Sequence, residues 1–192
     1  MASAGQSGSR FHDLDCWHKA DIGKRGIMSR LDSFIRRLEA QRSVLNWAAD
    51  FAADKEGLVL ELGLGNGRTY DHLRERLPGR AIHVFERSPS PNPQSMPPQH
   101  LLIIGEMEQT LPAFAARHGA EAILIHVDVT TGVPARDRFA FAWLPEHVAA
   151  LARPGGLIVS GWPLDDPAFE AVPLPADVPE ERYFAYRRRD AS

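Results

Sequence analysis

Four positions in the first half of the sequence have residue types and spacing that suit ligand binding. Glu61 ends an apolar run, and glycines follow at every second position as Gly63, Gly65 and Gly67. Alternate glycines let the backbone curl close beneath a ligand, because no Cβ stands in the way. The helix predicted directly after them would aim free N–H groups and a positive dipole end at an anion. The stretch therefore predicts a site for a nucleotide-like ligand.

The register of these glycines argues against one common nucleotide site. The dinucleotide fingerprint is Gly-x-Gly-x-x-Gly. Counted from Gly63 the sixth position is Arg68, and counted from Gly65 it is Tyr70. A nicotinamide-dependent oxidoreductase is therefore disfavoured. An acid at the end of the next strand, Glu86, is common to dinucleotide sites and others, so it does not decide between them.

The elements that must position these residues follow from the hydrophobic pattern. Helical spacing predicts helices over 29–54, 68–77, 106–118 (broken or started late at Pro112) and 135–152 (broken near Pro145). Short apolar runs predict strands at 58–62, 81–86, 100–105, 122–128 and 156–162, and a hairpin over 169–174 and 182–188. This alternation predicts an α/β fold: a Rossmann-like, doubly wound, seven-stranded sheet with helices on both faces.

Composition limits the class of protein. A chain of 192 residues suits one domain, expected over 28–192 after a flexible extension at 1–27. The net charge of -3 argues against a nucleic-acid partner, and no apolar run is long enough for a membrane span. One cysteine and the lack of an apolar N-terminal leader fit the cytoplasm. Residues 87–98 hold five prolines, predicting either a stiff cover over the ligand or a plain surface connection.

Several motifs together resemble one superfamily. The string ELGLGNG at 61–67 resembles motif I of the class I S-adenosylmethionine-dependent methyltransferases. VFE at 84–86 and IIGEME at 103–108 look like the second and third motifs of that superfamily, and RPGGLIVSG at 153–161 looks like its turn into strand five. More narrowly, the chain resembles a small stand-alone bacterial methyltransferase family of unassigned methyl acceptor. The resemblance covers residue 30 to the end and implies a mostly parallel sheet with a reversed last strand.

The resemblance implies S-adenosyl-L-methionine as cofactor and assigns roles to residues. The glycine turn would take the methionine carboxylate, Glu61 the amino or sulfonium side, and Glu86 the ribose hydroxyls. Arginine stacks on flat rings, so Arg87 would lie over the adenine. The full set of expected cofactor-binding residues is Glu61, Gly63, Gly65, Gly67, Arg68, Thr69, Glu86, Arg87, Glu106, Met107 and Asp128.

The acceptor side has fewer signals. Asp128 follows the fourth predicted strand and is the candidate catalytic residue, as a base or an orienting group, or else a turn carboxylate. His126 shares its face of that strand and is expected to be a satisfied core histidine. Tyr70 and Trp162 are candidates for the substrate pocket. Asp128 could also begin a divalent-metal site, but no oxygen ligands follow at the expected place after the fifth strand, so no metal is expected.

These observations predict a methyltransferase acting on a small molecule by in-line displacement. The alternative is a non-catalytic S-adenosylmethionine-binding sensor or scaffold, because no unambiguous catalytic group follows strands four and five. The roof of the acceptor site is expected from residues 11–54, from 129–140, or from a second subunit in a homodimer.

Overall fold

The computed structural model describes residues 29–129, 137, 139–180 and 182–190. The extension expected at 1–27 and part of the helix expected at 135–152 lie outside the described residues. The chain divides into two compact units, Met1–Arg36 and Arg37–Ser192. In the first unit, Ser29 accepts a hydrogen bond from the backbone N–H of Asp32 (3.0 Å) and donates one to its carboxylate (2.7 Å), which caps the start of helix α1 (Arg30–Ala52).

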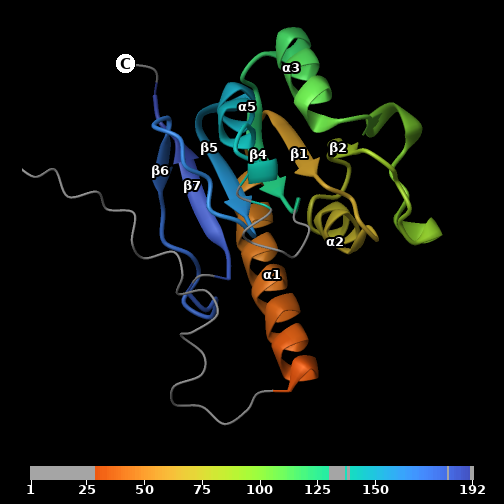
Figure 1. The fold of residues 1–192 in the computed structure, drawn as a ribbon, viewed down its shortest axis with the longest axis vertical. Coiled ribbons are helices and arrows are strands. Elements are labelled where there is room, and N and C mark those ends of the chain that lie inside the picture. Colours follow the sequence, from red (N-terminus) through yellow and green to blue (C-terminus); the bar gives the residue numbers. More distant parts are fainter. Residues whose placement is uncertain (1–28, 130–136, 138, 181, 191–192) are drawn as a thin grey trace, which may run out of the picture. The chain divides into compact units, whose positions relative to one another are not determined.

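The second unit is built on one seven-stranded sheet (Figure 1). The strand order is β3-β2-β1-β4-β5-β7-β6. The strands are β1 (Leu58–Leu62), β2 (Ile82–Glu86), β3 (Leu102–Ile104), β4 (Ala122–Val127), β5 (Ala152–Ser160), β6 (Phe169–Ala171) and β7 (Phe184–Arg188). In this spatial order, each of the first five strands (β3, β2, β1, β4 and β5) pairs in parallel with its neighbour. Strand β7 runs antiparallel to both β5 and β6. This is the predicted mostly parallel sheet with a reversed last strand.

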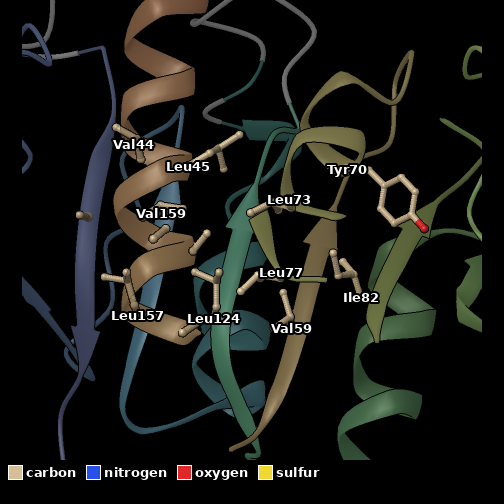
Figure 2. Close-up of a cluster of buried hydrophobic side chains, with 14 of the residues drawn as sticks. Val44, Leu45, Val59, Tyr70, Leu73, Leu77, Ile82, Leu124, Leu157 and Val159 are labelled. Carbon is tan, nitrogen blue, oxygen red and sulfur yellow. The ribbon is translucent and has the colours of Figure 1, made fainter. Parts of the chain in front are cut away.

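Helices cover both faces of this sheet, as predicted. The residues of α1 after Arg37 and helix α2 (Arg68–Arg76) share one buried cluster with Val59, Leu124 and Val159 (Figure 2). Helices α3 (Met107–His118) and α5 (Leu144–Leu151) share a second cluster with Leu60 and Ile125. Successive strand residues point to opposite faces, so Val59 and Leu60 belong to different clusters.

The same alternation decides where polar strand residues lie. Glu61 comes two residues after Val59, and His126 comes two residues after Leu124. Both therefore point to the face of the sheet that α1 and α2 cover. The sheet register pairs them directly, Glu61 opposite His126. Two polar groups are therefore held inside an otherwise apolar layer, which requires hydrogen-bond partners for both.

Some element bounds differ from the predicted ones. Helix α3 starts at Met107 and runs through Pro112 without the predicted interruption or late start. Strand β3 is only Leu102–Ile104, because a 3-10 turn occupies Gln99–Leu101. The break predicted near Pro145 is present: residues 141–143 form a turn, and Pro145 lies in the first turn of α5, where its missing N–H leaves no helical bond unmade.

Candidate functional site

The glycine turn between β1 and α2 has a backbone that only glycine adopts easily. Gly63, Gly65 and Gly67 have φ values of 95°, 50° and 82°. A Cβ on Gly63 would lie 2.6 Å from the carbonyl oxygen of Asp128, and one on Gly67 would lie 2.6 Å from the Cβ of Ser95. At Gly63 and Gly67 a side chain would therefore collide with neighbouring atoms, in addition to the strain of a positive φ.

Gly65 differs from its neighbours, because a Cβ there would meet nothing within 4 Å. It lies at a hollow into which the turn presents bare backbone. The next helix begins at once, and its N-cap Gly67 offers no side-chain hydrogen bond to the first turn. Helix N-termini without a side-chain cap leave N–H groups for water or a ligand, and their dipole favours an anion. The turn can thus cradle a carboxylate.

A cavity of about 190 Å³ opens at this turn. Its walls come from the carboxyl ends of three neighbouring strands, with Gly63 after β1, Asp128 after β4 and Gly161 after β5. The complete lining is Arg37, Gln41, Gly63, Leu64, Gly65, Asn66, Arg68, Thr69, Asp128, Gly161, Arg182 and Tyr183. The carboxyl edge of an open parallel sheet is where ligands of α/β proteins bind.

A second hollow of about 580 Å³ shares two lining residues, Asn66 and Arg68, with this cavity. Its remaining walls come from α2 and from Asn92, Gln94 and Ser95 of the proline-rich segment. It includes no strand end and no glycine of the turn. The smaller cavity is therefore the candidate site, because it joins the glycine turn to the sheet edge.

The proline-rich segment packs against the glycine turn. The backbone N–H of Asn92 donates to the carbonyl of Asn66 (3.2 Å), and Pro91 and Ser95 fill the space beside Gly67. A short 3-10 turn at Pro93–Ser95 is capped by the side chain of Asn92. Part of this segment thus supports the turn, so it is more than a surface connection; a cover over the ligand stays a prediction.

Glu86, at the end of β2, ties the glycine turn to the neighbouring strand. Its Oε2 accepts hydrogen bonds from the backbone N–H groups of Leu64 (3.0 Å) and Gly65 (3.3 Å), and its Oε1 accepts one from Ser88 (3.1 Å). Burial alone would raise the pKa of Glu86, but these N–H donors outweigh it and hold the pKa below its ordinary value. Glu86 is therefore a carboxylate fixed beside the turn, and its contact with a ribose stays a prediction.

Glu61 lies below the turn and is fully buried. Its Oε1 accepts a hydrogen bond from the hydroxyl of Thr69, in the first turn of α2, and its Oε2 lies 2.7 Å from Nδ1 of His126. Burial lowers the pKa of His126, but the carboxylates of Glu61 and Asp128 and the hydrogen bond to Glu61 raise it above the ordinary value. His126 is a satisfied core histidine, as expected, and Glu61 anchors the site from beneath.

A chain of hydrogen bonds leads from this pair to the cavity. Nε2 of His126 lies 3.3 Å from the hydroxyl of Tyr183, which accepts a hydrogen bond from Gln41 (2.9 Å). The same Gln41 nitrogen donates to Oδ2 of Asp128 (3.1 Å), an exposed carboxylate in the cavity wall. Asp128 is thus oriented by a partner from α1.

The expected adenine-side residues meet at the ends of β2 and β3. Arg87 lies 3.8 Å from Glu106 in an exposed ion pair, and Glu106 is the N-cap of α3. Met107 packs partly buried against the second core cluster. The structure brings Arg87 and Glu106 together, and their contact with an adenine stays a prediction.

Two candidates for the substrate pocket are placed elsewhere. Tyr70 is 2% exposed and packs in the core beside Leu73 and Ile82, because helix geometry turns it toward the sheet (Figure 2). Trp162 packs half-buried against the second cluster, while its neighbour Gly161 lines the cavity. Neither side chain lines the cavity, and their contact with a substrate stays a prediction.

Seven residues of the cavity were not predicted from the sequence: Leu64, Asn66 and Gly161, which adjoin predicted positions, and four from distant elements. Arg37 and Gln41 come from α1, and Arg182 and Tyr183 come from the segment entering β7. The hydrogen bonds of Gln41 span 87 residues to Asp128 and 142 residues to Tyr183. No local spacing signals such contacts, since they depend on how α1 and the reversed strand pack on the sheet.

The comparisons with known proteins agree with this geometry. Residues 28–188 match the model of a family described as S-adenosyl-L-methionine methyltransferase. The chain belongs to this family. Its methyl donor is therefore S-adenosyl-L-methionine, and it is a methyltransferase.

Solved structures support the assignment. An S-adenosyl-L-methionine methyltransferase from Silicibacter pomeroyi DSS-3 is 41% identical, with a TM-score of 0.79 over 84% of this chain and 99% of that chain. The cofactor-bound protein Rv0187 from MTB is 16% identical, with a TM-score of 0.51 over 93% of this chain and 95% of that one, which shows a shared fold. Among the curated proteins, no match was found.

The geometry of the site also fits this methyl donor. The bare backbone at Gly65, the uncapped start of α2 and the cavity beside them suit the carboxylate of the methionine end. Glu86, fixed as a carboxylate one strand away, can accept hydrogen bonds from a ribose. The described residues contain no group of three or more metal-binding side chains and no helix long and apolar enough for a bilayer.

Proposed function

We propose that this methyltransferase transfers the methyl group to a small-molecule acceptor held in the cavity at the carboxyl ends of β1, β4 and β5. One observation carries the proposal: the glycine turn and Asp128 line the same cavity. A donor bound on the turn would therefore have its reactive end within reach of a group held beside Asp128.

The cofactor side of the site is assigned to the ends of β1, β2 and β3. The turn at Gly63, Gly65 and Gly67, together with the N–H groups that start α2, would hold the methionine carboxylate. Arg68 would reinforce it with a positive charge. Glu86 would hold the ribose, and the pair Arg87–Glu106 would border the adenine with Met107. Glu61 would act indirectly, by fixing Thr69 and the start of α2.

Asp128 is the residue assigned to the acceptor. When bound, the cofactor supplies an electrophilic methyl group on a sulfonium, whose C–S bond breaks as the acceptor's lone pair forms the new bond. The protein's part is mainly alignment. Asp128, oriented by Gln41, would position the acceptor and can accept a proton from an oxygen or nitrogen nucleophile.

The proposal is tested with S-adenosyl-L-methionine that carries a deuterated methyl group. Purified protein is incubated with this donor and a pooled small-metabolite fraction, or with protein and RNA fractions in parallel. We expect the deuterated methyl group to appear by mass spectrometry in the small-metabolite fraction. Label confined to protein or RNA would contradict a small acceptor. Donor binding with no transfer in any fraction would favour the sensor or scaffold alternative.

A matched pair of variants guards this assay against contaminating activity. Asp128→Asn removes the proposed acceptor-side charge but keeps an oxygen for Gln41. Asp165→Asn makes the same change in the connection after β5, outside the cavity lining. We expect transfer to fall in the first variant and to persist in the second.

A further inference from the structure

The side chain of Gln41 is held in one orientation by its two hydrogen bonds. Its Nε2 donates to Oδ2 of Asp128 (3.1 Å) and to the hydroxyl of Tyr183 (2.9 Å). Because a carboxylate only accepts hydrogen bonds, the nitrogen end of the amide must face Asp128. An amide nitrogen has two hydrogens, and these two partners use both of them. Gln41 therefore has no donor left for a ligand.

Two side-chain oxygens remain beside this hydrogen bond. No described residue donates a hydrogen bond to Oε1 of Gln41 or to Oδ1 of Asp128. In the part of the chain that the structure describes, His83 alone has a side-chain polar atom that is both buried and unpaired, so Oε1 of Gln41 is open to solvent. Gln41 and Asp128 both line the cavity. Together they present two oxygens that can only accept hydrogen bonds.

A group with two hydrogens on one atom matches these two oxygens. Gln41 and Asp128 are in direct contact, so a single group can reach both side chains. A primary amino group has two N–H hydrogens and one lone pair, and the lone pair points away from the hydrogens. With both hydrogens bonded to the wall, the lone pair faces the open side of the cavity. A hydroxyl has one hydrogen and leaves one oxygen without a partner, which costs free energy once water is excluded.

We infer that the methyl group is transferred to the nitrogen of a primary amino group, which Gln41 selects through Oε1. This inference rests on the proposed function and names its substrate class. The nitrogen lone pair forms the N–C bond as the C–S bond breaks, and the electrons of the broken bond stay on sulfur. The nitrogen becomes positively charged and gives one hydrogen as a proton to Oδ1 of Asp128. The positive charge of Arg182, in the same lining, favours the neutral amine, which is the form that has the lone pair.

The first experiment measures the binding of small amines to the full chain saturated with S-adenosylhomocysteine, by NMR titration at neutral pH. The probes are aniline, N-methylaniline and N,N-dimethylaniline, which lose one N–H hydrogen at each step while their apolar area grows. We expect affinity to fall along this series, roughly 2- to 10-fold for each hydrogen bond lost. Affinity that rises along the series is the order that apolar burial alone dictates, and it would overturn the inference.

A variant of Gln41 tests whether its oxygen is responsible. Gln41→Lys keeps N–H donors for Asp128 and Tyr183 but has no oxygen, so the preference for aniline should disappear. Gln99→Lys makes the same change at an exposed position before β3, outside the cavity lining, and should keep the wild-type order. The inference is overturned if Gln41→Lys also keeps that order. It is equally overturned if Gln41→Lys loses affinity for S-adenosylhomocysteine at an unchanged melting temperature, because these oxygens would then hold the donor's own ammonium.

The second experiment locates the transferred methyl group. Tandem mass spectrometry of the labelled small metabolite should place the deuterated methyl group on nitrogen, and a label on oxygen or carbon would refute the inference. Failure of the proposed function has a different signature. In that case no small metabolite is labelled at all, while the amine series still tests the two oxygens, because binding requires no turnover.

Discussion

Glu61 and His126 lie opposite each other on adjacent parallel strands, with Oε2 of the glutamate 2.7 Å from Nδ1 of the histidine and neither side chain exposed. The pair lies directly beneath the ligand cavity, joined to it through Thr69 on one side and Tyr183 on the other. Burying an ion pair in a core costs desolvation free energy, and replacing such a pair by apolar groups is often neutral for stability. Its value here is that it fixes the start of α2 and the orientation of Tyr183.

Breaking the pair should destabilise the protein. Glu61→Gln leaves His126 buried without its counter-charge, and losing one partner of a buried pair costs about 3–5 kcal/mol. The free energy of unfolding in urea measures the loss. Glu170→Gln, an exposed position on the edge strand β6, is the control and should change it by less than about 0.5 kcal/mol. Equal stability of the two variants would contradict the anchoring role.

The pair also gives stability a pH dependence of defined sign. The folded-state pKa of His126 lies above its ordinary 6.5, so its contribution is fully present below that pH and is lost as pH rises through the raised value. Burial lowers the pKa values of His72 and His83. These two histidines therefore change the free energy of unfolding only at pH values below 6.5. Urea unfolding should show stability declining as the pH rises above about 6.5. A wild-type slope that Glu61→Gln leaves intact would refute this assignment.

Substitutions at Gly65 and Gly79 distinguish the effect of backbone strain from the effect of lost ligand contact. Gly65→Ala places a methyl group in open space at the cavity, at a φ of 50° that costs an L-residue about 1–2 kcal/mol. We expect donor affinity to fall at least tenfold by calorimetry. Gly79→Ala has a comparable φ of 78°, also meets nothing within 4 Å and lies outside the cavity lining, so it should lose similar stability with unchanged affinity. Equal donor affinity in both variants would place the donor elsewhere.

Glu86 should contribute to donor binding through its charge. Glu86→Gln keeps one hydrogen-bond acceptor for the turn but removes the carboxylate that holds Leu64 and Gly65. Hydrogen bonds to charged groups contribute about 1.5–3 kcal/mol, so donor affinity should fall roughly 10- to 100-fold. Calorimetry measures this, with Glu121→Gln, at an exposed position before β4, as the control. A variant that binds as tightly as the wild type would exclude Glu86 from the donor site.

Asp128 should affect turnover more than donor binding. If it takes a proton from the acceptor, Asp128→Asn lowers kcat by about 10²–10⁴-fold, the usual contribution of a general base. Donor affinity should change little, because the Asn oxygen still accepts from Gln41. Steady-state kinetics with the acceptor identified by deuterium transfer would measure both quantities. A loss of donor affinity without loss of kcat would reverse the assignment.

The proximity of the glycine turn to Glu86 could be predicted from the sequence, whereas the contacts around Asp128 could not, for a physical reason. The residues Gly63, Gly65, Gly67 and Glu86 follow strand ends within one βαβ unit, so local patterns place them together. Gln41, Arg182 and Tyr183 reach the cavity from α1 and the reversed strand, and only tertiary packing brings them there. The burial of Tyr70 was not predicted, because proximity to the turn in sequence does not fix the face of α2 on which a side chain lies.

Helix α3 also differs from its prediction, because it contains a proline in its interior. Pro112 was expected to interrupt or delay the helix, since proline lacks an N–H donor, yet the helix starts at Met107. Leu111 and Phe114, on either side of this proline, are buried in the second cluster. Their burial outweighs the local penalty, which no local propensity could have signalled.

A crystal structure of the protein with S-adenosylhomocysteine tests the proposed donor site most directly. We expect the methionine carboxylate within hydrogen-bond distance of the glycine turn and the start of α2, the ribose hydroxyls at Glu86, and the sulfur facing Asp128. The product bound in the larger hollow between α2 and the proline-rich segment, with Gly65 and Asp128 free of contact, would contradict it.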